Sequence, residues 1–373
     1  MSRILRCIDT VAPQYGGPSY SVINSSRIMA RRGHKVTIVT MDRTGDVPLE
    51  PDEPFELVCL GPGFSNYRIN PAYLVWLSRH LRSYDFATVQ GVWRFASYGF
   101  HLVNRLARVP YMVMPHGSLD VWDKNSRRLS FLGKKLYWNL LESSLYRRAE
   151  QCYFTAEQEQ RSSAEAFSFE GVKHSVIAYG SVDRRAFRLE PREADRISIA
   201  YLGRLHQKKG IEILLAAFAA VYREEPLARL RIAGGGEASY VASLRAQVSE
   251  LGIERHVEWV GHVSGESKDE LLINAGLFVL PSYQENFGLA VAETLSYGTP
   301  VAVSANVNTA PAIAAASAGY VCENSVSAVT DVLRVWKNGG YRDPQIRIRA
   351  RACFEQSMSL ERFVDDLVAR HAL

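Results

Sequence analysis

Short apolar runs rich in β-branched residues alternate with longer helical patterns along almost the whole chain, and this alternation most constrains the fold. Helical stretches separate most of the runs. In the stretch 19–33, for example, Val22, Ile23 and Met29 share one helix face and Gly33 ends the helix. The candidate strands are 4–9, 35–41, 55–60, 86–90, 111–115, 152–155 and 174–178, then 197–203, 229–234, 256–261, 277–282, 300–304 and 319–322. Apolar strands that alternate with helices predict parallel sheets covered by helices on both faces.

The alternation is interrupted once, by the charged and apolar-poor stretch SVDRRAFRLEPREADR at 181–196, which we interpret as an inter-domain linker. A chain of 373 residues is also longer than a single hydrophobic core usually supports, which favours two domains. We therefore predict an α/β protein of two Rossmann-like, doubly wound domains, residues 1–180 and 181–354, facing each other across a cleft. The final stretch SLERFVDDLVARHA predicts an amphipathic helix with Leu360, Phe363, Leu367 and Val368 on its apolar face.

Composition excludes several classes of protein. The net charge of +5, from 44 basic and 39 acidic residues, is too weak to indicate nucleic-acid binding, so no nucleic-acid partner is expected. The five cysteines are scattered without a CxxC pair, which favours a reducing compartment over a disulfide framework or a zinc site. The N-terminal MSRILRCIDTVAP lacks the apolar core of a signal peptide, and no run approaches the ~18 apolar residues of a spanning helix. We expect a soluble or peripheral protein in the cytoplasm.

Doubly wound domains bind ligands at the carboxyl ends of their strands, so the residues that follow each strand are the first candidates for a site. The sequence GRLHQKKG at 203–210 follows one strand and opens a helix, with Arg204 and Lys209 five residues apart. A guanidinium, an ammonium and a helix N-terminus suit a diphosphate. A solvated basic loop remains an equal alternative at this point, and Lys208 fits that description.

Two glutamates, Glu285 and Glu293, stand eight residues apart in PSYQENFGLAVAETLSYGTPV at 281–301, around the start of an apolar helix. Ionised carboxylates only accept hydrogen bonds, so they suit the vicinal hydroxyls of a ribose or a hexose and not a phosphate. One carboxylate at each end of a ligand, with phosphates between, describes a nucleotide-sugar. The alternative is a helix-start charge at Glu285 and a surface residue at Glu293. The apolar neighbours of Glu293 disfavour that alternative, because a buried acid needs a partner.

Two further stretches follow strands of the first half. MPHGSLD at 114–120 places His116 before Gly117 at a strand end, where a structural histidine is the commoner case. PQYGGPSYS at 13–21 places Gly16 and Gly17 after the first strand, where the backbone can approach a ligand. This stretch is not GxGxxG, so it is a weak dinucleotide signal.

Together these motifs resemble the GT-B glycosyltransferases of family GT4, the retaining "glycosyl transferase group 1" enzymes. The resemblance covers nearly the whole chain: the Gly-Gly loop, HG at 116–117, GRLxxxKG at 203–210, GGGE at 234–237, and PSxxExFGLxxxExxxxGxPV at 281–301. The pair of glutamates with an upstream arginine and lysine is its most specific part. The chain departs from the family at AYGSVD (178–183), where relatives often read PNGVD, and at Gln90, where many have histidine.

The resemblance implies a role for each of these positions. Arg204 and Lys209 neutralise the donor diphosphate, and Glu293 binds the ribose hydroxyls. Glu285 contacts the hydroxyls of the transferred sugar, and His116 lies near that sugar at the reacting face. Gly16 and Gly17 border the donor phosphate and the acceptor. The remaining donor-site residues are backbone positions beside the sugar: Asn286, Phe287, Gly288 and Leu289. The resemblance also implies that the first domain, 1–180, lies on the acceptor side and that the second, 181–354, binds the nucleotide-sugar donor. The C-terminal helix, 355–373, is expected to pack back on the first domain.

Cleavage of a sugar–diphosphate bond leaves charge on a phosphate oxygen, so its largest demand is electrostatic. No Asp-x-Asp motif occurs in the chain, so we expect a metal-independent reaction without a cofactor, in which Arg204, Lys209 and the helix start after Glu285 stabilise the leaving group. Retention of configuration is implied by the family. Since no covalent nucleophile stands out, a front-face transfer assisted by the leaving phosphate is the expected mechanism.

The stretch 124–148 carries seven basic residues and one acid, interleaved with leucine, phenylalanine, tyrosine and tryptophan. This pattern fits docking on an anionic membrane surface at the inner face of the cytoplasmic membrane. An ordinary amphipathic helix, with Leu132, Leu136 and Leu140 in the core, is an equal alternative. Since the family often extends lipid-linked saccharides, the expected acceptor is a glycan or lipid-linked saccharide of a bacterial surface polysaccharide such as lipopolysaccharide.

Other functions on the same frame remain open. A nucleotide-sugar hydrolase or epimerase would form product without an acceptor, and a non-catalytic nucleotide-binding module would form none. A site that had lost its catalytic function would be expected to lack some of its polar residues, but this sequence retains the full set: His116, Arg204, Lys209, Glu285 and Glu293. A dehydrogenase is least favoured, because the dinucleotide fingerprint is missing.

Overall fold

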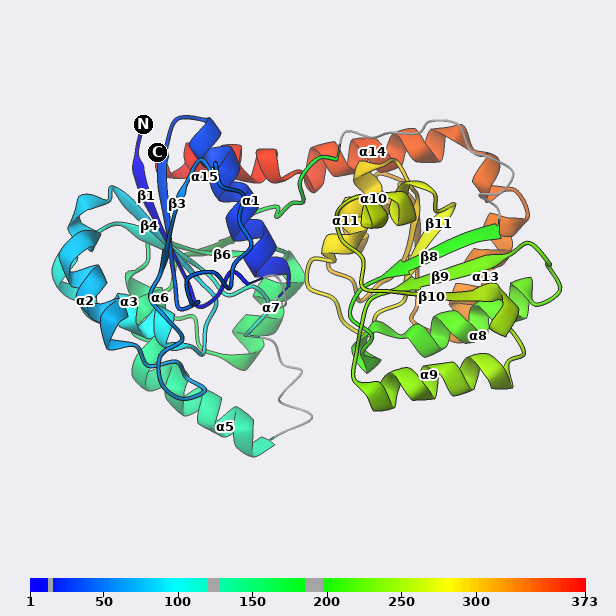
Figure 1. Cartoon of the computed structure of the whole chain (residues 1–373), viewed down its shortest axis with the longest axis horizontal. Coiled ribbons are helices and arrows are strands. Elements are labelled where there is room, and N and C mark those ends of the chain that lie inside the picture. The colour runs from blue at the N-terminus through cyan, green and yellow to red at the C-terminus, as the bar shows by residue number, and fades with distance from the viewer. Residues whose placement is uncertain (13–15, 120–127, 185–196) are drawn as a thin grey trace. The chain divides into compact units, whose positions relative to one another are not determined.

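The computed structural model describes residues 1–12, 16–119, 128–184 and 197–373. The chain divides into two compact units, the first comprising residues 1–179 and 363–373 and the second residues 180–362. Most of the predicted linker, residues 185–196, lies outside the described residues. In each unit, Figure 1 shows a twisted sheet with helices on both of its faces.

The first unit is built on a seven-stranded sheet in the order β3-β2-β1-β4-β5-β6-β7, and every ladder in it is parallel. Its strands are β1 (Arg3–Ile8), β2 (Lys35–Thr40), β3 (Glu56–Cys59), β4 (Phe86–Gln90), β5 (Tyr111–Met114), β6 (Gln151–Phe154) and β7 (His174–Val176). The strand order reverses between β1 and β4. A crevice opens at the carboxyl ends of the strands at such a point.

The second unit repeats this architecture with a six-stranded parallel sheet in the order β10-β9-β8-β11-β12-β13. Its strands are β8 (Ser198–Leu202), β9 (Arg229–Ala233), β10 (Val257–Gly261), β11 (Leu277–Leu280), β12 (Val301–Ser304) and β13 (Gly319–Cys322). Here the order reverses between β8 and β11. Every predicted strand is present and ends within two residues of its predicted bounds, because buried parallel strands are apolar throughout.

Helices connect the strands of both sheets. The first unit contains α1 (Gly17–Arg31), α2 (Pro71–His80), α3 (Phe95–Ala107), α5 (Arg128–Tyr137), a π-helical turn (Trp138–Glu142), α6 (Ser143–Arg148) and α7 (Glu157–Ala166). The second unit contains α8 (Ile211–Tyr222), α9 (Ala238–Glu250), α10 (Gly265–Ile273), α11 (Leu289–Ser296), α12 (Ala310–Ala315), α13 (Val326–Lys337) and α14 (Pro344–Ser357). Short 3-10 turns span Leu81–Ser83, Gln207–Lys209, Glu254–His256 and Gly340–Arg342. No helix of the described chain has the length and apolar character needed to cross a membrane.

The last helix, α15 (Leu360–His371), belongs to the first unit from Phe363 on, later than the predicted residue 355. Within that unit, Phe363 meets the ring of Tyr179 edge-on, and the Tyr153 hydroxyl lies 3.1 Å from the Nε2 atom of His371. Leu360, Phe363 and Leu367 are buried as expected. Val364 completes the buried stripe in place of the predicted Val368, which is only partly buried.

The predicted basic stretch 124–148 forms α5, the π-helical turn and α6, while residues 124–127 lie outside the described chain. Leu132, Leu136 and Leu140 are 62%, 62% and 69% exposed. The interpretation that they belong to the core is therefore wrong. The core contacts of this segment come instead from Phe131, Trp138 and other residues on the opposite side of the helix.

The π-helical turn buries one acid completely. Glu142 has no exposed surface, and its Oε1 atom accepts hydrogen bonds from Ser97 Oγ at 2.5 Å and from the Tyr137 hydroxyl at 3.0 Å. Burial raises the pKa of the Glu142 carboxyl from 4.5 to about 7, although these hydrogen bonds lower it. The folded protein therefore binds more protons than the unfolded chain between pH 4.5 and 7, and its stability falls as the pH rises through that window.

We expect Glu142→Gln to raise the free energy of unfolding at pH 8 by about 2 kcal/mol, because the variant no longer buries a charge. Denaturant unfolding of both proteins at pH 5 and pH 8 measures the effect. The difference should shrink towards pH 5, where the wild-type carboxyl is protonated in the folded state. An equal difference at both pH values would contradict the pKa assignment.

Candidate functional site

The predicted phosphate loop and the loop of Glu285 lie next to each other in the second unit, because they follow β8 and β11, which are neighbours in the sheet. The backbone N–H of Tyr283 donates a hydrogen bond to the Lys208 carbonyl at 2.8 Å. Gly210, at φ 64°, allows the backbones of the two loops to lie in contact, since a Cβ atom there would lie 2.2 Å from the Pro281 carbonyl oxygen. Only glycine fits this position.

Lys209 and Glu285, predicted separately, form an ion pair between Nζ and Oε2. Their side chains are 19% and 18% exposed, so the pair is partly shielded from water. Arg204 is exposed at the start of the same loop, and its carbonyl accepts a hydrogen bond from the Tyr201 hydroxyl at 3.1 Å. The second unit thus places a guanidinium, an ammonium and a carboxylate on two adjoining strand-end loops.

The predicted helix start after Glu285 is α11, which begins at Leu289 with Gly288 as its N-cap at φ 73°. Among the described residues no side chain caps this N-terminus, and its first turn carries no acid. The Glu285 loop is also tied to the loop after β12: the N–H of Glu285 donates to Asn306 at 3.2 Å and that of Asn308 donates to the Glu285 carbonyl at 3.0 Å. Asn308 further donates to the Asn286 side chain at 3.1 Å. Phe287 is buried beside them.

Glu293 is only 3% exposed, so the interpretation that it is a surface residue is wrong. Its Oε1 atom accepts a hydrogen bond from Lys268 Nζ at 2.6 Å and lies 3.8 Å from Arg184. The sequence indicated that a buried acid here needs a partner but did not identify Lys268, which comes from α10. The only sequence signal for Lys268 is its position within the acidic stretch GESKDE at 265–270.

In the first unit, His116 lies just after β5 in the left-handed backbone region, at φ 52°, which is strained for a residue other than glycine. Its Nε2 atom lies 2.6 Å from the Gln90 Oε1 atom, and Gln90 donates in turn to the Thr88 hydroxyl at 2.9 Å. Burial, and then the buried Arg6 guanidinium, lower the pKa of His116 to about 3. His116 is therefore neutral at physiological pH, and Gln90 orients its ring.

The backbone that follows His116 is held by an acid that sequence reasoning missed. Glu159, at the start of α7 and 5% exposed, accepts hydrogen bonds from the Gly117 N–H at 2.5 Å and from the Thr155 N–H at 2.8 Å. Because both donors are backbone groups of loops, the sequence carries no pattern for this contact. Glu159 fixes the turn that presents His116.

His116 and Gln90 line a cavity of about 140 Å³ at the carboxyl ends of β1, β4 and β5. Asp9 and Arg94 also line it, and neither was singled out in the sequence. Their positions in the sequence could have indicated a site, since Asp9 follows the first strand and Arg94 follows the fourth. Burial raises the pKa of the Asp9 carboxyl, although Arg68 and Arg94 lower it.

The predicted glycines lie at the start of α1, which follows this cavity's first strand. Gly16 has φ 87° and is the N-cap, and Gly17 is the first residue of the helix. Pro18 and Ser19 of the same turn line the cavity. Residues 13–15 of the predicted loop lie outside the described chain.

Comparison with protein families matches both halves of the chain. Residues 183–351 match the family described as "Glycosyl transferases group 1", and residues 16–180 match the "Glycosyl transferase 4-like domain". Mannosylfructose-phosphate synthase of Agrobacterium fabrum is 26% identical over 328 residues, which are 79% of this chain and 72% of that protein.

Solved structures share the fold over the full length. Sucrose-phosphate synthase from Thermosynechococcus elongatus superposes with a TM-score of 0.79 at 17% identity, covering 99% of this chain and 98% of that one. HepE from Anabaena, in complex with UDP, superposes with a TM-score of 0.78 at 16% identity, covering 99% of both chains. At these identities the likeness establishes the fold alone.

Proposed function

Since this chain is a GT4-like glycosyltransferase with the GT-B fold, we propose that it transfers a hexose-type sugar from a nucleotide-diphosphate sugar to a saccharide or lipid-linked saccharide acceptor, with retention of configuration. The donor binds at the loops after β8 and β11 of the second unit. Arg204 and Lys209 compensate the diphosphate charge, and Glu285 binds hydroxyls of the transferred sugar. Glu293 binds the ribose hydroxyls. His116 of the first unit serves as a neutral hydrogen-bonding group at the sugar.

One observation carries this proposal: Lys209 and Glu285 are in contact, on loops that adjoin Arg204 and an uncapped helix N-terminus. A phosphate next to a sugar presents anionic oxygens and hydroxyls side by side. A cation and an acceptor-only carboxylate in the same order complement that pattern. The uncapped first turn of α11 adds backbone donors for the phosphate.

A calorimetric screen of UDP-, GDP- and ADP-sugars tests donor binding, and it begins with UDP-glucose because HepE has been crystallised with that donor. We expect one nucleotide series to bind, and its affinity to fall in Glu285→Gln. Donor turnover is then followed with and without added saccharide acceptors. Product that accumulates equally without any acceptor would indicate a hydrolase instead.

The reaction is proposed to be independent of metal ions, with Arg204, Lys209 and the N-terminus of α11 taking the charge that develops on the leaving diphosphate. We expect transfer rates to change less than about twofold when EDTA is added, since no step requires a Lewis acid. The measurement is product formation after exhaustive EDTA treatment, with MnCl₂ and MgCl₂ added back. Loss of activity in EDTA that Mn²⁺ restores would overturn this part of the proposal.

For a lipid-linked acceptor, we propose that α5 docks on an anionic membrane. Leu132 and Leu136 of α5, and Leu140 of the π-helical turn that continues it, recur every four residues and form an exposed apolar stripe. Lys135, Arg147 and Arg148 are exposed along the same segment. An apolar stripe with basic neighbours suits the boundary between acyl chains and anionic headgroups. The proposed location is the inner face of the cytoplasmic membrane, in the synthesis of a surface polysaccharide such as lipopolysaccharide.

We expect replacement of Leu132, Leu136 and Leu140 with glutamine to lower partitioning onto vesicles of phosphatidylglycerol and phosphatidylethanolamine by about tenfold or more. The reason is that the leucine side chains no longer enter the bilayer. Co-sedimentation at several lipid concentrations measures this partitioning. Vesicles of phosphatidylcholine alone should bind the wild-type protein less well.

A matched control replaces three exposed apolar residues of the second unit with glutamine: Leu227, Val335 and Ile348. Its partitioning should equal that of the wild type. Equal loss in both triple variants, or binding of the wild type that ignores anionic lipid content, would contradict docking through α5.

A further inference from the structure

Two side chains from distant parts of the sequence contact His116 within the first unit. The Nε2 atom of His116 lies 2.6 Å from Gln90 Oε1, and the Gln90 amide donates in turn to the Thr88 hydroxyl at 2.9 Å. The ring of Tyr179 meets the imidazole at a centroid distance of 5.5 Å and an angle of 60°. Gln90 and Tyr179 stand in the two stretches at which the chain departs from the family pattern, so both departures meet at one histidine.

The contact with Gln90 fixes the place of the proton on the neutral imidazole ring. Gln90 donates through its amide nitrogen to Thr88, so its Oε1 atom faces His116 as an acceptor. A carbonyl oxygen only accepts hydrogen bonds, so the Nε2 atom of His116 carries the proton. A neutral imidazole has one N–H group. The Nδ1 atom of His116 therefore keeps a lone pair and is an acceptor.

The buried Arg6 guanidinium keeps this ring from taking a second proton. Arg6 is 1% exposed, and its hydrogen-bond partners among the described residues are all neutral: the Val22 carbonyl and the hydroxyls of Ser25 and Ser26. Its charge therefore acts on the groups around it. Burial lowers the pKa of His116, and the Arg6 charge lowers it further. The ring keeps one donor and one acceptor nitrogen at neutral pH.

Tyr179 limits the rotation of the imidazole. It is 7% exposed and lies between His116 and Phe363 of α15, whose ring centroids are 5.5 and 5.2 Å from its own. Both contacts are edge-to-face, at angles of 60° and 79°. Since Phe363 has no exposed surface, the tyrosine ring is itself fixed by the core. Aromatic pairs favour this geometry, so the contact opposes a turn of the His116 ring away from Gln90.

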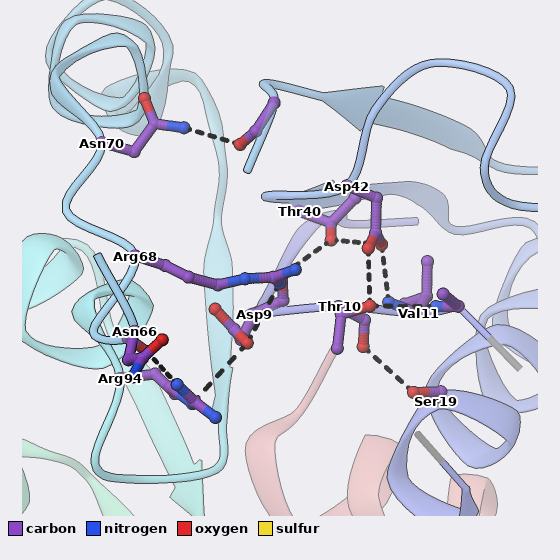
Figure 2. Close-up of polar contacts among 12 residues, drawn as sticks. Asp9, Thr10, Val11, Ser19, Thr40, Asp42, Asn66, Arg68, Asn70 and Arg94 are labelled. Carbon is purple, nitrogen blue, oxygen red and sulfur yellow. Dashed lines mark hydrogen bonds and ion pairs between the residues drawn. The ribbon is translucent and has the colours of Figure 1, made fainter. Parts of the chain in front are cut away.

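This arrangement leaves Nδ1 as the atom of His116 that is available to a ligand. Within the described chain the only hydrogen bond of the ring is the one to Gln90, and His116 lines the cavity of about 140 Å³. Asp9 and Arg94 of the same cavity face each other, as Figure 2 shows, with Arg94 Nε 3.9 Å from Asp9 Oδ2. An acceptor nitrogen selects a ligand group that donates, such as a hydroxyl, over a phosphate oxygen that only accepts.

We propose that Gln90 and Tyr179 are positioning residues for His116: Gln90 keeps the proton on Nε2, Tyr179 keeps the ring in place, and Nδ1 accepts a hydrogen bond from a hydroxyl of the transferred sugar. This inference rests on the proposed function, which supplies the sugar. It gives the neutral histidine a direction, because a ring with its proton on Nδ1 would present a donor to the same hydroxyl.

The position of the proton is measured by long-range ¹H–¹⁵N NMR of the full chain labelled with ¹⁵N-histidine, at pH 7 and without ligand. His116→Gln identifies the signal of His116 among those of the nine histidines. We expect the wild-type protein to show a protonated Nε2 atom and an unprotonated Nδ1 atom. Gln90→Met keeps the length of the side chain but removes the acceptor oxygen. Both tautomers should then be populated, neither exceeding the other by more than about tenfold.

Gln151→Met is the matched control. Gln151 is also a strand glutamine of the first sheet that donates to a hydroxyl, that of Ser175 at 2.9 Å, but it does not line the cavity. This variant should leave the tautomer of His116 unchanged.

Two replacements of Tyr179 separate the effect of its ring from that of its hydroxyl. Tyr179→Phe keeps the edge-on contact, so the ring protons of His116 should keep their chemical shifts and kcat should change less than about threefold. Tyr179→Leu removes the aromatic ring. The ring protons of His116 should then lose their ring-current shift, and kcat should fall by about tenfold.

Kinetics with the nucleotide-sugar selected by calorimetry connect the position of the ring to function. Gln90→Met is expected to lower kcat by about tenfold, because the sugar loses one well-directed hydrogen bond. The Kd of the same nucleotide without its sugar should change by less than about twofold, since Gln90 acts only through the histidine at the sugar. Gln151→Met should match the wild-type protein in both measurements.

A wild-type His116 with its proton on Nδ1 would overturn the proposal, as would a tautomer and a kcat that stay unchanged in Gln90→Met. Equal losses of kcat and of nucleotide affinity in that variant would assign Gln90 to the fold instead. The NMR measurement needs no ligand, so it separates this inference from the proposed function. If no nucleotide-sugar binds the wild-type protein, the proposed glycosyl transfer fails, whatever the tautomer of His116.

Discussion

Replacing Arg204 with alanine is expected to lower the kcat of sugar transfer by about 10²–10³-fold, as the loss of a fixed donor at a developing oxyanion does in other enzymes. Arg204 stands exposed at the start of the β8 loop, ahead of Lys209. Its guanidinium can therefore reach a diphosphate without first breaking a buried ion pair. Lys209→Ala should cost a similar factor, and it additionally leaves Glu285 without its ion-pair partner.

Steady-state kinetics with the donor identified by calorimetry measure both variants, and Lys208→Ala provides the control. Lys208 belongs to the same loop and carries the same charge as Lys209, but it is not among the residues that we predict to contact the donor. It should change kcat by less than about threefold, the effect of a surface charge. A similar loss in all three variants would indicate a general effect of loop charge and not specific compensation of the leaving group.

Glu293→Gln should lower the free energy of unfolding by about 3 kcal/mol, because it leaves the Lys268 ammonium shielded and without its carboxylate partner. The Lys268 and Glu293 side chains are 15% and 4% exposed, so water replaces the lost partner poorly. Denaturant unfolding measures the change. Glu258→Gln, which breaks the exposed pair with Arg231, should cost less than about 1 kcal/mol.

The same variant separates a structural from a ligand-binding role for Glu293. Lys268→Met combined with Glu293→Gln should recover part of the lost stability, since neither charge is then buried. If Glu293 also binds the ribose, the double variant still binds the donor more weakly than wild type. Recovery of both stability and donor affinity in the double variant would assign Glu293 to the fold alone.

The accuracy of the strand prediction has a physical cause. A strand buried on both faces must be apolar at every position, and turn residues must follow it, so its signal is local. The segment 124–148 shows the limit of the same reasoning. Its periodicity predicts a helix, but two opposite faces of this helix carry apolar residues. Whether Leu132 or Trp138 faces the core depends on which neighbours this helical segment meets, and no local pattern contains that information.

The candidate site divides in the same way. Arg204, Lys209, Glu285 and Glu293 are visible in the sequence, because sheet topology requires ligand groups directly after strands and at helix starts. The sequence by itself thus determined the fold class and the chemical types of the groups in the candidate site. Only the tertiary structure decided their partners: Lys209 with Glu285, Glu293 with Lys268, and His116 with Gln90. It also showed that Asp9 lies between Arg68 and Arg94. These contacts join residues far apart in the chain, and they depend on the twist and register of the sheets, which no short stretch of sequence encodes.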